Sequence, residues 1–96
     1  MIDIKQIFED NFNEHGRFED VKVKFSSRRD LHAFILLDKL LPDDDNSIIV
    51  AAEHDEIYLS ADMEHLAKAA TEENIIDLIR CGIRYDEQTD SLNKFV

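Results

Sequence analysis

The sequence predicts an α+β fold, a ferredoxin-like βαββαβ sandwich with an extra N-terminal helix and a C-terminal strand. Two observations predict it. Apolar residues recur at helical spacing in some segments and alternate with polar residues in others. The expected core order is then strand, helix, strand, strand, helix, strand. At 96 residues and 44% hydrophobic composition, the chain is expected to form a single α+β domain over residues 1–96.

The N-terminal segment is predicted to be a short amphipathic helix over residues 2–12. Ile4, Ile7, Phe8 and Phe12 fall at positions i, i+3, i+4 and i+8, which places them on one helical face. Gly16 is expected to end the turn that follows. The chain is then positioned to enter its first strand.

Residues 21–25, "VKVKF", alternate apolar and basic side chains, which predicts a half-buried strand with one wet face. A second helix follows, with Ser27 as the predicted N-cap and Asp30 in the first turn, where the helix dipole favours an acid. Pro42 is expected to end this helix, because proline cannot continue it.

The second helix is unusually apolar. Eight of the eleven residues in 31–41 are apolar, His32 and Lys39 project to nearly the same side, and Asp38 falls inside the apolar arc. A helix that is apolar around most of its circumference is covered on more than one side. We expect the N-terminal helix to provide the second cover; a homodimer contact is the alternative.

The remaining elements follow from turn and capping signals. Residues 47–53 and 56–61 are predicted to form a hairpin around a tight turn. A helix over residues 62–82 has Asp62 as N-cap and Gly82 beyond its C-terminus, and Thr71 can restart it as a second helix. Residues 83–87 and 91–96 are predicted to form a closing hairpin around 88–90.

The charge is concentrated in one part of the chain. The net charge is −11, but residues 1–42 hold eight acids and seven bases, whereas residues 43–96 hold fourteen acids and four bases. Such a surface repels nucleic acid and anionic membranes and attracts basic protein surfaces. We therefore expect no direct binding to nucleic acid and no binding to membranes.

The predicted topology gathers the acids of the second half. Because each element reverses direction, the turns sort into two ends of the domain, and several acidic turns fall at the same end. Glu19 and Asp20, before the first predicted strand, are expected there too. The candidate partner-binding residues are Asp43, Asp44, Asp45, Asp62, Glu64, Asp86, Glu87 and Asp90.

A rival topology is a helix-turn-helix with a wing over residues 63–96. Its recognition helix would carry Glu72, Glu73 and Asp77 against a single Arg80. Three carboxylates repel a phosphate backbone, and such modules depend on cation–phosphate contacts. DNA reading is not expected even if this shape forms.

No metal site or cofactor is predicted. Asp43, Asp45 and Ser47 have calcium-loop spacing, but Ile48 replaces the required glycine and His54 the bidentate glutamate. The sequence has no HExxH motif and no paired cysteines, and we expect its histidines to lie on the surface beside acids. These histidines are His15, His32, His54 and His65.

No catalytic residues are predicted, and we expect the protein not to be an enzyme. Cys81, the single cysteine, lies at a helix C-terminus, where the dipole disfavours a thiolate. Asp38 is the sole candidate for a carboxyl with a raised pKa, and we expect it to reach water or a lysine instead. No phosphate-cradling glycine loop is present.

Two functions follow from this composition. The first is a small acidic protein-interaction module, an inhibitor or nucleic-acid mimic that binds the basic surface of a nucleic-acid-binding protein; phage proteins that block host nucleases or defence systems are analogous in size and charge. The alternative is a small-molecule-binding or regulatory dimerisation domain. The lone cysteine and the absence of an N-terminal signal pattern predict a cytoplasmic protein.

Overall fold

The computed structural model describes residues 1–42 and 47–95. Helices and a β-sheet form separate layers, and none of the helices in these ranges is long and apolar enough to cross a membrane. The helices are α1 (Ile4–Asp10), α2 (Arg29–Leu40), α3 (Met63–Ala69) and α4 (Glu72–Arg80), with short 3₁₀ turns η1 (Phe12–Glu14) and η2 (Phe18–Asp20). The strands are β1 (Ile49–Glu53), β2 (Glu56–Leu59), β3 (Ile83–Asp86) and β4 (Ser91–Phe95).

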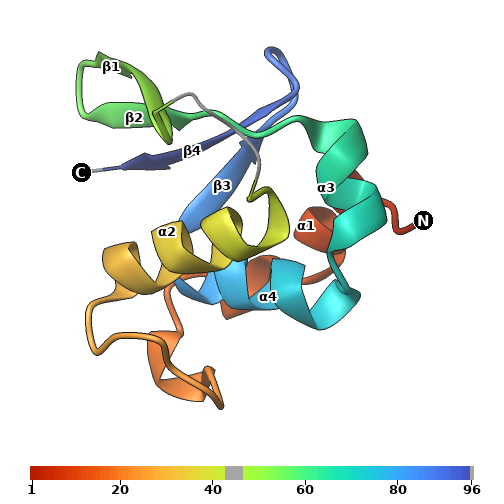
Figure 1. The fold of residues 1–96 in the computed structure, drawn as a ribbon, viewed down its shortest axis with the longest axis vertical. Coiled ribbons are helices and arrows are strands. Elements are labelled where there is room, and N and C mark those ends of the chain that lie inside the picture. Colours follow the sequence, from red (N-terminus) through yellow and green to blue (C-terminus); the bar gives the residue numbers. More distant parts are fainter. Residues whose placement is uncertain (43–46, 96) are drawn as a thin grey trace.

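The strands form one antiparallel sheet of four strands in the order β1-β2-β4-β3. Both predicted hairpins are present, and β2 and β4 join them at the centre of the sheet. Helices α1, α2 and α4 lie on the same side of the sheet, and β1 and β2 extend away from them (Figure 1). The side chains of Leu59, Leu92 and Ile83 point into the core between these layers and are at most 2% exposed.

The α+β class is confirmed, but the ferredoxin-like order is not. Residues 21–25, predicted to be the first strand, form no strand. Val21 is buried, whereas Val23 is 72% exposed, although the two would share a face in a strand. Local polar contacts replace a ladder: Lys24 Nζ donates to the Val21 carbonyl at 2.8 Å, and the Phe25 N–H donates to His32 Nδ1 at 3.1 Å.

Helix α4 is the centre of the core. Its Ile75, Leu78 and Ile79 are at most 2% exposed, and it packs against α1, α2, β3 and both 3₁₀ turns. The spacing of these residues at i, i+3 and i+4 places them on one stripe of the helix. The chain before α2 is held to this helix by the Gly16 N–H, which donates to the Ile79 carbonyl at 3.1 Å.

Helix α2 is not covered by the element that was expected to pack over it. The predicted cover by the N-terminal helix is wrong, because α1 packs mainly on α4 and β3, while α2 packs on α4. The buried face of α2 consists of His32, Ala33, Leu36 and Leu37. Leu31 remains 45% exposed, so the apolar circumference of α2 is only partly covered.

Capping decides where the helices begin and end. Asp62 is the N-cap of α3, as predicted, and Thr71 forms a capping box with Asn74 that starts α4 as a separate helix. Gly82 follows α4 with φ of +89°, the left-handed conformation that favours glycine. The prediction of Ser27 as the N-cap of α2 is wrong, because Arg28 occupies that position without a side-chain hydrogen bond.

Candidate functional site

The strand register brings several acidic segments to one end of the sheet. Leu59 at the end of β2 pairs with Leu92 near the start of β4, and Leu92 pairs with Tyr85 near the end of β3. The segment leading to α3 and the β3–β4 turn therefore lie beyond the same end, at the upper right of Figure 1. We call the carboxylates of these two segments the acidic end; they are Asp62, Glu64, Asp86, Glu87 and Asp90.

Three of these carboxylates, at the β3–β4 turn, are held by contacts within the hairpin or with α1. Glu87 pairs with Lys5 of α1 at 2.7 Å, and this hydrogen bond raises the pKa of Lys5. Asp86 accepts the Gln88 N–H at 2.9 Å. Asp90 adopts φ of +49° and accepts the Tyr85 hydroxyl at 2.5 Å.

The β3–β4 turn also changes the pKa of the Tyr85 phenol. The hydrogen bond to Asp90, together with burial and neighbouring carboxylates, raises the pKa of Tyr85 to about 12. The phenol therefore stays protonated and continues to donate to Asp90 across the physiological pH range. The Asp90 carboxylate is held by its own hairpin, which fixes one negative charge in place.

The first turn of α3 holds the other two carboxylates. Asp62 accepts the backbone N–H groups of Glu64 and His65 at 3.0 and 3.2 Å. Glu64 pairs with Lys68 one turn later at 3.6 Å. Both members of that pair are more than half exposed, so the ion pair is screened and weak.

Two further sets of residues were predicted to lie at this end. Asp43, Asp44 and Asp45 lie outside the described residues. The segment Phe18–Asp20 lies at the bottom of Figure 1, remote from the β3–β4 turn at the top, so the expectation that Glu19 and Asp20 join the acidic end is wrong. The physical reason is that residues 21–25 form no strand to carry them there.

A groove lies between α1 and β3. Its volume is about 400 Å³. Phe8 and Tyr85 form its apolar wall, with ring centroids 6.0 Å apart, and Phe12 at its rim is 77% exposed. Two bases, Lys5 and Arg84, and two acids, Glu9 and Glu87, complete the lining, so their formal charges balance, unlike those of the acidic end. The sequence offered no signal for it, because the lining comes from segments that are remote along the chain.

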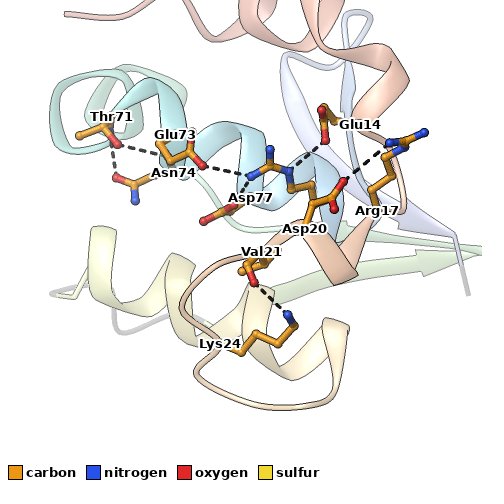
Figure 2. A network of polar contacts seen from close by, with 10 residues as sticks. Glu14, Arg17, Asp20, Val21, Lys24, Thr71, Glu73, Asn74 and Asp77 are labelled. Atoms are coloured by element: carbon orange, nitrogen blue, oxygen red, sulfur yellow. Dashed lines mark hydrogen bonds and ion pairs between the residues drawn. The ribbon is translucent and has the colours of Figure 1, made fainter.

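Arg80, the last residue of α4, organises a polar network. Its Nε donates to Glu14 at 3.0 Å, and its Nη1 donates to Glu73 and Asp77 at 3.0 Å each. Figure 2 shows Glu14, Glu73 and Asp77 turned toward the same guanidinium group. Burial opposes the charge of Arg80, but these hydrogen bonds outweigh it and raise its pKa. The network ties the η1 turn to α4, which is a structural role.

His32 is a buried imidazole, and the prediction that the histidines lie on the surface is wrong for this residue. It is 1% exposed, stacks on Phe25 at a centroid distance of 5.0 Å and meets the edge of Phe18 at 5.6 Å. Its Nδ1 accepts the Phe25 N–H, and its buried Nε2 has no hydrogen-bond partner among the residues that the structure describes. Burial lowers the pKa of His32, and Lys24 adds to this effect against the opposing Asp77.

His32 should make the stability of the protein depend on pH. Because its folded-state pKa lies below the value of about 6.5 expected in the unfolded chain, the unfolded state binds more protons as the pH falls. The stability contributed by the neutral ring is present above about pH 6.5 and is lost as the pH falls through that value toward the folded-state pKa. Urea unfolding between about pH 7.5 and 5.5 measures this loss.

His32→Gln is the matched control for that measurement, since an amide oxygen can accept the Phe25 N–H without titrating. The variant should lose clearly less stability than the original chain over the same pH range. Equal losses in the two proteins would show that His32 is not the group responsible.

Cys81 is fully buried after α4. Burial, with the nearby Asp77 carboxylate, raises the pKa of the Cys81 thiol to about 12. At neutral pH the thiolate population is negligible, and the thiolate is the nucleophilic form. Cys81 therefore acts as a small core residue.

Within residues 1–42 and 47–95, no group of three or more histidine, cysteine, aspartate or glutamate side chains is arranged to hold a metal ion. Asp38 lies on an exposed part of α2, away from an apolar environment. Comparisons with protein-family models, curated proteins and solved structures found no match to this chain.

Proposed function

We propose that this chain is a small, non-enzymatic protein-interaction module that binds the basic surface of a nucleic-acid-binding protein, as an inhibitor or nucleic-acid mimic of the phage counter-defence type. One observation supports the proposal: two segments remote in sequence, each rich in carboxylates, follow the same end of the sheet in a chain of net charge −11. A cytoplasmic location belongs to the proposal and is supported by the free, buried Cys81.

The contacts at the acidic end would allow basic residues of a partner to replace the lysines that pair there. Asp62, Asp86 and Asp90 accept hydrogen bonds from their own segments, which fixes the positions of their charges. Glu64 and Glu87 pair with exposed lysines, and exposed pairs contribute only about 0–1 kcal/mol. An arginine of a partner can therefore replace either lysine at little cost. Complementary charge of this kind steers association and weakens as salt rises.

Competition with DNA tests the proposal. Nucleic-acid-binding proteins retained on the immobilised chain are purified and loaded with a fluorescent DNA duplex, and the chain is titrated in at low and at high salt. We expect displacement of the duplex at low salt and a steep loss of displacement as salt increases, because the interaction is electrostatic.

Two double variants with the same net charge locate the binding surface. Glu64→Lys with Glu87→Lys should weaken displacement by about tenfold or more, because both reversals lie at the acidic end. Glu19→Lys with Asp38→Lys changes exposed carboxylates elsewhere and should have a much smaller effect. Equal effects of the two pairs, or no displacement by the original chain, would refute the proposal.

A second candidate function, small-molecule binding, is favoured by the groove between α1 and β3. Its volume of about 400 Å³ and its aromatic wall of Phe8 and Tyr85 are typical of ligand sites. Because Glu9 and Glu87 balance Lys5 and Arg84 in the lining, the groove favours a neutral or zwitterionic aromatic ligand. A rise in melting temperature with such compounds, unaffected by Glu64→Lys, would distinguish this function from the first.

A further inference from the structure

Strand β1 lies at one edge of the sheet. Among the strands in the described part of the chain it pairs with β2 alone, and all its residues, Ile49–Glu53, are exposed. Ile49 is 43% exposed and Val50 is 59% exposed, which is unusual for β-branched residues in a strand. In Figure 1, the β1–β2 hairpin projects beyond the helical layer, so no helix covers the free edge of β1.

This edge lacks most of the features that normally prevent pairing. Edge strands are usually protected by lysine, by proline or by inward-pointing charge. Residues 48–52 carry no charge and no proline, in a chain whose net charge is −11. A register shift between Ile49 and Ala51 is the one irregularity in the pairing of β1 with β2. The free backbone N–H and C=O groups of β1 can therefore accept another strand.

The far end of β1 carries a charge arrangement that favours a cation. Glu53 and Glu56 are directly opposite each other in the β1–β2 pairing, where like charges are destabilising. Among the described residues, neither carboxylate has an ion pair with lysine or arginine; Glu53 meets only His54, at 3.9 Å. Asp55 in the turn adds a third negative charge. A lysine or arginine beside this end would relieve the repulsion.

We propose that β1 binds an extended segment of a basic partner protein as an added antiparallel strand, with neutral or β-branched residues along Ile49–Ala52 and lysine or arginine beside Glu53 and Glu56. The inference rests on the proposed function and adds the way in which the partner binds. Backbone hydrogen bonds supply the pairing, and the opposed glutamates select the basic flank.

A second copy of the chain fits this edge poorly. Antiparallel self-pairing would place the Glu53 end of each β1 beside the Ile48 end of the other. There the Ile48 carbonyl accepts the Ser60 N–H at 2.6 Å, and the chain leads on to Asp62. The Glu53 end of one copy would then lie beside the segment that leads to Asp62 in the other copy. No cation would separate these carboxylates, which is unfavourable.

A pair of synthetic peptides tests the proposal on the full chain. The first alternates valine and threonine and is flanked by lysines; the second is identical except for N-methyl groups on alternate backbone nitrogens, which remove the donors that face β1. We expect the first peptide to slow amide hydrogen exchange in β1 and to bind about tenfold tighter than the second, because only the first can form the ladder. Equal binding by both peptides would refute strand addition.

Matched variants locate the contact. Val50→Asn should weaken binding of the first peptide several-fold, whereas Val23→Asn, at another exposed valine, should leave it unchanged. Equal effects of the two would place the peptide elsewhere and refute the inference. Protection of β1 in the absence of peptide, with a dimer in sedimentation, would also refute it and identify a second copy as the occupant.

The two proposals fail in different ways. If binding of the first peptide persists after Glu53→Lys with Glu56→Lys and is independent of salt, strand addition stands but the selection of a basic partner is wrong. If the peptides bind equally and both lose affinity with salt, the acidic attraction stands and strand addition is wrong.

Discussion

Arg80→Ala is expected to lower the free energy of unfolding by about 3 kcal/mol or more, because it leaves carboxylates unpaired in a partly buried site. The Arg80 side chain is 14% exposed, and its partners Asp77 and Glu14 are 18% and 21% exposed. Water cannot replace the lost guanidinium fully at that depth. Urea unfolding at neutral pH measures the difference.

Arg17→Ala is the control for this prediction. Arg17 pairs with Asp20 at 3.7 Å, and both side chains are more than 40% exposed, so its removal should cost less than about 1 kcal/mol. A loss for Arg80→Ala as small as that for Arg17→Ala would show that the network does not stabilise the fold. Because Asp77 also lies near His32 and Cys81, Arg80→Ala should in addition alter the pH dependence of stability.

Leu37→Ala is expected to cost about 3 kcal/mol, because it removes a leucine that is 3% exposed from the contact between α2 and the core. Leu31→Ala provides a matched control on the same helix. Leu31 is 45% exposed, so the same truncation should cost less than about 1 kcal/mol. Thermal or urea unfolding of both variants measures the difference.

This pair also tests the orientation of α2. The residues of 31–41 are so uniformly apolar that the sequence alone cannot identify the buried face. Similar losses for the two leucine variants would indicate that another molecule covers the exposed side of α2 in solution. That outcome would contradict the exposure of Leu31, not the packing of α2 on α4.

Local signals predicted most of the elements. The two hairpins, the N-cap at Asp62 and the place of Gly82 after a helix were predicted from short segments, whereas a break of the helix at Thr71 was left open and is decided by the structure. Each depends on capping or turn chemistry that acts over a few residues. The alternation in residues 21–25 was misleading, because a strand also requires a neighbour to pair with, and His32 binds that segment instead.

The candidate sites also differ in whether the sequence predicted them. Charge counting identified the acidic second half of the chain, and the alternation of direction predicted that the acidic residues of the β3–β4 turn and the start of α3 follow the same end of the sheet. The exposed edge of β1 and the groove between α1 and β3 were not predicted. Their existence depends on which elements leave a surface uncovered, and composition carries no such information.

By itself, the sequence determined the α+β class, the position of nearly every helix and strand after residue 27, and the excess of negative charge, because these depend on periodicity, capping and ionisation of individual residues. Only the tertiary structure decided which face of α2 is buried, that His32 is a core residue and that β1 is an open edge beside opposed glutamates. Those features arise from packing between segments remote in sequence, where long-range contacts override local preference.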